Sequence, residues 1–199
     1  LKSVDLAMNF LGHLYFSGDD HALMAANLYG DFVKGADISR FSPTVQKGIT
    51  LHRTIDSYID NHPAVVELLH SLYPHLPKIA GIAIDLYFDH LLAKRWSEFH
   101  PTSFAKYLSD FYHSIEFTNP DYSDEFVFVL RKIVEHNWIY QYQFSHGLYK
   151  ACQGVSRRIS FANELIHGQE VFERMEDQIT FSFDQYMSDA KTKFLSETR

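Results

Sequence analysis

The chain has 199 residues, of which 46% are hydrophobic, and this size suits one domain with a substantial core. A net charge of −7 argues against a general nucleic-acid-binding protein, because such proteins need a basic surface that displaces counterions. Only 9 Gly and 6 Pro are present, so a turn-rich all-β fold is disfavoured as well.

Helical signals recur along the chain. Asp19–Asp20 can cap a helix that runs to about Tyr29. Ser42 followed by Pro43 is a strong helix start, and this helix should run to about Asn61. The later candidates are a helix opened by His62–Pro63 and the ranges 78–96, 102–117, 121–136, 139–152, 155–167 and 170–195. No segment is typical of a βαβ unit, so we predict an all-α fold, a single compact multi-helix domain that spans residues 8–199.

The sequence shows no domain linker, membrane span or secretion signal. Gly154 and Gly168 are expected to separate helices, not domains. The longest apolar stretch, residues 79–88, is interrupted by Asp85 and is shorter than the ~20 residues that a span needs. The single Cys152 permits neither an intrachain disulfide nor a cysteine-based zinc site. We therefore expect a cytoplasmic protein with a buried thiol and no membrane contact.

A histidine and an aspartate lie on the apolar face of the helix expected at 43–61. Since a helix turns by about 100° per residue, His52 and Asp56 share one stripe with the apolar residues around them. A buried, unpaired carboxylate is costly, so something cationic must compensate, and a metal ion is one answer. A plain hydrogen-bonded His–Asp pair is the alternative.

The helix expected at 78–96 also places carboxylates and a histidine among apolar residues. Asp85 and Asp89 lie one turn apart among apolar residues, and His90 follows on the adjacent face. Two carboxylates in a dry core repel each other unless a cation intervenes. Oxygen and imidazole ligands without thiolates suit Mn²⁺, Mg²⁺, Fe²⁺ or Zn²⁺.

These residues also have explanations without a metal. Arg53 or Arg95 could neutralise the carboxylates, and His90 could be a core histidine whose ring is satisfied. The metal hypothesis is therefore supported mainly by the presence, in one small domain, of two helices that each carry histidine and aspartate on an apolar face. Asp31 and His13 are further candidates.

Charge is unevenly distributed along the chain. From His136 to Asn163 there is no acidic residue, whereas Lys150, Arg157 and Arg158 are basic. A basic stretch on an acidic protein predicts a local site for an anionic partner. A solvated helix face with incidental charge is the alternative.

Four motifs carry a resemblance: NFLGHLYFS from Asn9, GDFVKG from Gly30, GITLHRTIDSYIDNHP from Gly48 and DLYFDHLLAKRW from Asp85. In this order they resemble the acyl carrier protein phosphodiesterase family, and SRRISF from residue 156 is similar to a later basic–aromatic motif. Met8 resembles the usual family start. Residues 1–7 are therefore interpreted as an N-terminal extension or a remnant of expression.

The resemblance implies an enzyme that hydrolyses holo-acyl carrier protein to the apo-protein and 4′-phosphopantetheine. The family is similar to the helical HD phosphohydrolases and is regarded as manganese-dependent, so an HD-phosphohydrolase-like fold and Mn²⁺ are implied. The His-Asp doublet of HD proteins is missing here; the chain has the reversed pair Asp89–His90. The carrier protein is small and acidic, and the residues expected to dock it are Lys150, Arg157 and Arg158.

The resemblance and the helix positions together suggest a role for each candidate. The expected metal ligands are His52, Asp56, Asp89 and His90. The expected general base is Asp85 or Asp31. The expected phosphate-binding residues are Arg53 and Lys34. The candidates for protonating the leaving serine are His62 and His13.

Two other functions stay open. An HD-like phosphohydrolase that acts on a small nucleotide or phosphomonoester would use much the same residues. A non-catalytic helical module with a salt-bridged core would bind no metal.

Overall fold

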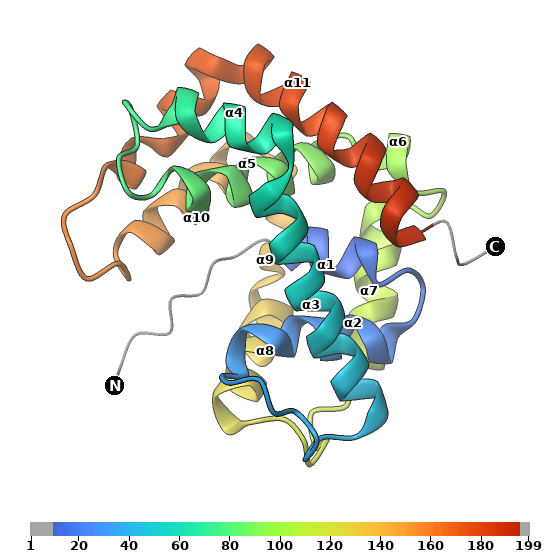
Figure 1. The fold of residues 1–199 in the computed structure, drawn as a ribbon. Helices are drawn as coiled ribbons and strands as arrows, with labels where there is room; N and C mark the ends of the chain where they lie inside the picture. The colour runs from blue at the N-terminus through green and yellow to red at the C-terminus, as the bar shows by residue number, and fades with distance from the viewer. Residues whose placement is uncertain (1–9, 196–199) are drawn as a thin grey trace.

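The computed structural model describes residues 10–195, and these residues form helices and no strand (Figure 1). The predicted all-α class is confirmed for this part of the chain. The interpretation of residues 1–7, and the family-like start at Met8, lie outside the described residues.

The helices follow one another with mostly short connections. Their bounds are α1 Phe10–Phe16, α2 His21–Leu28, the 3₁₀ helix η1 Tyr29–Phe32, α3 Pro43–Asn61, α4 Pro63–Leu72, α5 Ala80–Lys94, α6 Trp96–Phe99, α7 Phe104–Ser114, α8 Asp124–His136, α9 Trp138–Gln141, α10 Ser145–Ser156, the 3₁₀ helix η2 Glu164–His167 and α11 Gly168–Leu195. None of the described helices combines the length and the apolarity that a membrane span requires.

The start signals in the first half of the chain are confirmed. Asp20 is the N-cap of α2, and its side chain accepts a hydrogen bond of 3.0 Å from the N–H of Leu23. Pro43 occupies the first turn of α3, after Ser42 in an extended conformation. The helix ends at Asn61 because the next proline opens α4. These local rules place α3, which carries two of the candidate site residues.

The prediction of helices at 139–152 and 155–167 is wrong. The structure breaks the chain earlier, between α9 and α10, and Gly154 lies inside α10. The break depends on Gly147, because a Cβ there would lie 1.8 Å from the carbonyl oxygen of Gln141. Gly154 has no such neighbour, and one glycine costs a helix only about 1 kcal/mol. Gly168 does mark a boundary, between η2 and α11.

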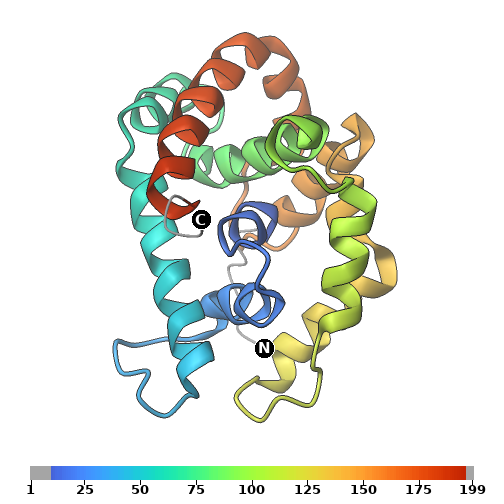
Figure 2. The same cartoon turned by 90° about the vertical axis from the view of Figure 1, so that its right-hand side faces the viewer.

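The packing encloses α1 at the centre of the molecule. Figure 2 shows α1 between α3 on one side and α7 on the other, below the layer that contains α4, α5 and α11. Helices α2 and α3 approach closely at Gly48, where a Cβ would lie 2.4 Å from Ala26. Helix α5 is buried on almost every face, as its nearly continuous apolar sequence requires. Polar side chains on α1, α3 and α5 are therefore directed into the interior.

Candidate metal centre

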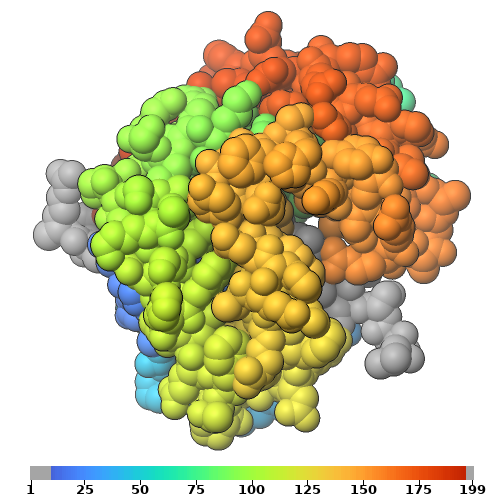
Figure 3. All heavy atoms as spheres, turned by 180° about the vertical axis from the view of Figure 1, so that it is seen from behind, coloured from blue at the N-terminus to red at the C-terminus, as the bar shows by residue number. Residues whose placement is uncertain are grey.

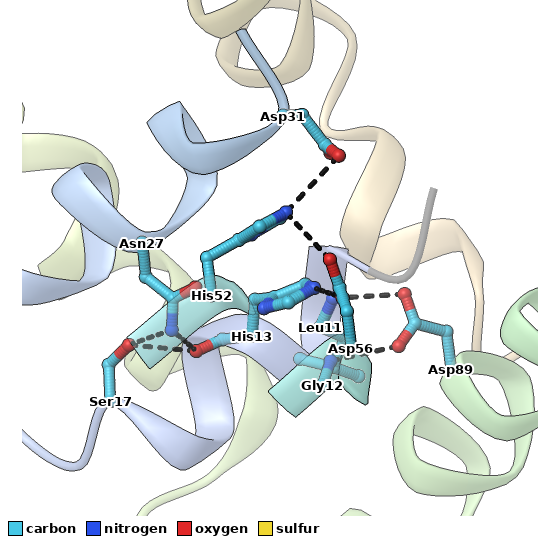
Figure 4. Close-up of polar contacts among 9 residues, drawn as sticks. All are labelled: Leu11, Gly12, His13, Ser17, Asn27, Asp31, His52, Asp56 and Asp89. Atoms are coloured by element: carbon cyan, nitrogen blue, oxygen red, sulfur yellow. Dashed lines mark hydrogen bonds and ion pairs between the residues drawn. The ribbon is translucent and has the colours of Figure 1, made fainter. Parts of the chain in front are cut away.

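A cluster of polar side chains forms where α1, η1 and α3 meet (Figure 4). The two carboxylate oxygens of Asp56 lie 3.2 Å from His13 Nε2 and 3.1 Å from His52 Nε2. Asp31 Oδ1 lies 3.3 Å from the same nitrogen of His52. The side chains of the two histidines are 1% and 4% exposed, whereas that of Asp56 is 43% exposed. The cluster is therefore deep on the imidazole side and open to solvent at Asp56.

The position of Asp31 follows from two close contacts between η1 and α3. A Cβ on Gly30 would lie 2.2 Å from His52 Cγ, so only glycine lets η1 approach the imidazole this closely. Arg53 Nη2 donates hydrogen bonds to the carbonyl oxygens of Val33, at 3.3 Å, and Gly35, at 2.7 Å. The guanidinium thus ties the segment after η1 to α3.

Helix α1 is held at its first turn by a carboxylate from α5. The two oxygens of Asp89 accept hydrogen bonds from the N–H groups of Leu11, at 2.9 Å, and Gly12, at 2.8 Å. These N–H groups have no partner within the helix, so a buried acceptor satisfies them. Burial raises the pKa of Asp89 to about 8, even though the two N–H bonds act in the opposite direction.

The carbonyl group of His13 is held by two further buried side chains. Asn27 Nδ2 donates to the carbonyl oxygen of His13 at 3.0 Å, and Ser17 Oγ donates to the same oxygen at 2.8 Å. Asn27 also donates to Ser17 Oγ at 2.9 Å, so the three groups form one closed network. The imidazole of His13 stacks on that of His52 with ring centroids 4.1 Å apart. This network fixes the backbone that directs the ring towards Asp56.

The cluster perturbs its own titrating groups. Burial and the neighbouring His52 lower the pKa of His13, so its imidazole is neutral. Burial alone would lower the pKa of His52, but contacts with Asp31 and Asp56 outweigh it and raise this pKa to about 9. Burial acts upwards on the pKa of Asp56, yet the two histidines hold it well below its usual range. Asp56 is therefore an ionised carboxylate.

The donor set and its spacing fit a divalent metal. Within residues 10–195, one group of three side chains has its potential ligand atoms all within 4.8 Å of one another. Its members are His13, His52 and Asp56. Atoms bound at 2.1 Å to one metal are about 3.0–3.4 Å apart in octahedral or tetrahedral geometry, close to the 3.2 and 3.1 Å between the Asp56 oxygens and the two imidazole nitrogens. The buried Nε2 of His13 lies 3.2 Å from Asp56 Oδ1, which places it where it could share a metal with this carboxylate.

The cations expected to neutralise this cluster are engaged elsewhere. Arg53 binds main-chain carbonyl groups, as described above. Arg95 pairs with Glu98 at 2.7 Å and with Asp184 at 2.6 Å, and both acids are exposed. The explanation of the candidate site as a salt-bridged core is therefore wrong for these two arginines.

The structure brings together only part of the expected ligand set. His52 and Asp56 meet as predicted, but Asp89 caps α1, and His90 lies outside the cluster. His90 Nδ1 is 2.6 Å from the carbonyl oxygen of Tyr142, to which it donates, and the ring packs edge-on against Phe172. Sequence reasoning gave His13 little weight and missed Asn27. Neither residue stands out by spacing, because its partners lie on other helices.

The other candidate residues are dispersed. Asp85 lines a small cavity of about 20 Å³ with Gly12 and Asp89, which is room for a single water. Burial and the neighbouring Asp56 charge raise the pKa of Asp85 well above its usual range. His62 Nε2 lies 3.2 Å from Asp189 Oδ2, away from the cluster. The candidates that are exposed to solvent are Lys34, Lys150, Arg157 and Arg158.

Comparison with known proteins identifies the family. The family model for acyl carrier protein phosphodiesterase matches residues 8–190. A protein named acyl carrier protein phosphodiesterase from Enterobacter sp. (strain 638) is 28% identical over 152 residues, which cover 76% of this chain and 79% of the relative. A protein of the same name from Photorhabdus laumondii is 29% identical over 156 residues, with 76% and 77% coverage.

No solved structure matches this chain significantly, so the expected likeness to the HD phosphohydrolases stays a prediction. The family model nevertheless covers most of the sequence, including every residue of the cluster. The chain belongs to the acyl carrier protein phosphodiesterase family.

Proposed function

We propose that this protein hydrolyses the phosphodiester bond between 4′-phosphopantetheine and the serine of holo-acyl carrier protein. Water adds to phosphorus, the bond from phosphorus to the serine oxygen breaks, and the serine hydroxyl takes up a proton. The products are apo-acyl carrier protein and 4′-phosphopantetheine. Together with the family assignment, the observation that carries this proposal is the convergence of two buried imidazoles on the ionised carboxylate of Asp56.

The proposed metal site consists of His13, His52 and Asp56, and Mn²⁺ is the proposed ion. Two imidazole nitrogens and one carboxylate are a donor set that Mn²⁺ accepts. A metal held by these residues would lower the pKa of a bound water and would polarise a phosphoryl oxygen. The exposed side of Asp56 is where a phosphodiester can enter, because the histidines are closed off by the core.

Asp31 is the proposed general base. Its Oδ1 contacts His52, but Asp31 lies outside the group of three ligands, so Oδ2 can accept a proton from water. Asp85 is less suited to this role, since burial favours its neutral form. Asp89 and His90, which were expected as ligands, are proposed to support α1 and α10 instead.

The two expected phosphate-binding residues receive different roles in this proposal. Arg53 already donates to two carbonyl groups, so we assign it to holding the segment that follows Asp31. Lys34 lies in this segment and is exposed, so its ammonium group can offset the charge on the non-bridging phosphate oxygens.

A mass assay tests the proposal. Purified protein is incubated with Mn²⁺ and holo-acyl carrier protein, and the carrier protein is expected to lose the phosphopantetheine mass. Asp56→Asn should prevent this loss. Turnover of nucleotides or phosphomonoesters, with holo-acyl carrier protein left intact, would contradict the proposal and support a phosphohydrolase of small substrates.

A further inference from the structure

The exposed apolar side chains of this protein are concentrated in one part of the chain. In the described residues, the large hydrophobic side chains that are most exposed include five between positions 138 and 166, which are Trp138, Phe144, Tyr149, Phe161 and Ile166. The others of this kind, Tyr73, Phe128 and Phe181, lie apart from one another in sequence. A local concentration of exposed aromatic groups is typical of a protein-binding surface.

The same part of the chain is locally basic. It contains Lys150, Arg157 and Arg158, and no acidic residue occurs between His136 and Asn163. The whole chain has a net charge of −7, so the remainder is more acidic still. An acidic partner is therefore repelled by most of the molecule and attracted to this region.

Three of these residues, Tyr149, Arg157 and Ile166, lie around Gln153 on one surface of α10 and the segment after it. Tyr149 and Arg157 are eight residues apart with Gln153 midway, and this spacing aligns them on a helix. Gln153 Nε2 donates to the carbonyl oxygen of Ile166 at 3.1 Å, and Gln153 Oε1 lies 3.5 Å from Arg157 Nη2. Figure 3 shows this orange part of the chain on the outside of the molecule.

We infer that this surface docks the holo-acyl carrier protein, and this inference rests on the proposed function. The basic–aromatic face is defined as Tyr149, Arg157 and Ile166 together with their exposed neighbours in the chain, Lys150, Arg158 and Phe161. Its cations steer an acidic partner into position, and Tyr and Arg are the side chains that most often dominate binding energy at interfaces. The substrate is a small acidic protein, so its charge is opposite to that of this face.

The helix that carries the basic–aromatic face packs against α5, which in turn holds α1. Helix α10 begins three residues after Tyr142, whose carbonyl oxygen accepts the hydrogen bond of His90. The residue before His90 is Asp89, which holds the first turn of α1, and that turn leads directly to His13. A carrier protein bound on α10 is therefore adjacent to the elements that position the cluster.

Binding and turnover of holo-acyl carrier protein by a charge-reversed variant test this inference. In Lys150→Glu/Arg157→Glu, the dissociation constant measured by calorimetry with EDTA present should rise about tenfold or more at low salt. Tyr149→Ala should raise it about fivefold. Raising the salt should weaken binding to the wild type and hardly affect the double variant, because exposed charges are screened over about 3 Å at 1 M salt.

The matched control for the charge reversal is Lys191→Glu/Lys193→Glu, which reverses two exposed charges elsewhere, and Phe181→Ala is the matched control for Tyr149→Ala. Lys191 lies roughly 30 Å along α11 from the end that packs against α10. Both controls should bind carrier protein like the wild type. Equal weakening in the control, or unchanged binding in the charge-reversed variant, would overturn the inference.

A second readout separates docking from damage to the metal centre. A short neutral serine peptide that carries phosphopantetheine offers the same bond without a protein surface. The preference for carrier protein over this peptide, taken as the ratio of the two kcat/KM values, should fall about tenfold in the charge-reversed variant. A proportional loss on both substrates would contradict docking. If the wild type binds carrier protein on this face but hydrolyses neither substrate, the docking inference stands and the proposed function fails.

Discussion

Two regions of this protein bury histidine and aspartate side chains at helical spacing, yet they use them differently. On α3, His52 and Asp56 face each other and the side chains of His13 and Asp31, so side-chain donors converge on one point. On α5, Asp89 and His90 face main-chain groups. In the first arrangement, side-chain donor atoms converge where a cation can bind. In the second, the side chains form hydrogen bonds with main-chain groups and stabilise the fold.

The comparison predicts a separation of function from stability. Side chains that converge on a metal site are placed for binding, so losing one should remove activity with little effect on the fold. A group that satisfies buried main-chain atoms stabilises the fold and is expensive to remove. Substitutions in the two regions should therefore affect different measurements.

The largest effect is expected for Asp56→Asn. Loss of the shared carboxylate should lower kcat/KM for holo-acyl carrier protein by about 10³-fold, since a metal contributes several kcal/mol to such reactions. Without metal, thermal unfolding should occur only slightly below the wild-type temperature, because the half-exposed carboxylate loses its ion pair with His52. Normal turnover in Asp56→Asn, or a severe loss of stability, would erase the distinction between the two regions.

The second effect concerns the stability of the fold. Asp89→Ala leaves the N–H groups of Leu11 and Gly12 without acceptors, and this should lower the free energy of unfolding by about 2–4 kcal/mol. Asp89→Asn keeps one acceptor oxygen and should recover part of the loss. Urea denaturation measures both values. A stable Asp89→Ala variant that no longer binds Mn²⁺ would instead make this carboxylate a metal ligand.

Asn27→Ala should affect both the stability of the fold and the binding of Mn²⁺. Asn27 is fully buried and donates to the carbonyl oxygen of His13, so its loss should cost about 1–3 kcal/mol and weaken Mn²⁺ binding about tenfold. Ser17→Ala removes the second donor to the same oxygen and is expected to have a smaller effect of the same kind. Equal Mn²⁺ affinities in wild type and Asn27→Ala would show that the network has no part in positioning His13.

The smallest effect is expected for Arg53→Gln. This change removes the hydrogen bonds to Val33 and Gly35, which should reduce stability by about 1 kcal/mol. Turnover should fall severalfold because the segment after Asp31 is less restrained, while KM for carrier protein changes little. A large rise in KM with unchanged kcat would instead place the guanidinium on the phosphate.

Several features of the fold could be predicted from local rules. The cap at Asp20, the helix start at Pro43 and the burial of His52 follow from capping chemistry, from proline geometry and from helical periodicity. The buried thiol of Cys152 is also confirmed. The α9–α10 break was missed because it depends on a contact of Gly147 with another helix, whereas Gly154, which looked like a breaker, has room inside α10.

In the candidate site, too, contacts between helices could not be predicted from local sequence. Periodicity identifies the face on which Asp89 lies, but its hydrogen-bond partners are on α1, 78 and 77 residues away in sequence. His13 lies on a helix of 7 residues, too short for a periodic signal. Sequence spacing thus identified the buried polar residues of α3 and α5 without distinguishing those that meet side chains from those that meet the main chain.

Mn²⁺ titration of two matched variants tests the central claim most directly. His13→Gln and His90→Gln each replace a buried imidazole with an amide of similar reach, and calorimetry gives the Mn²⁺ affinity of each. We predict that His13→Gln loses affinity by about 10²-fold or more, and that His90→Gln binds like the wild type. The reverse result, with Mn²⁺ retained in His13→Gln and lost in His90→Gln, would contradict the assignment of the metal centre to α1 and α3.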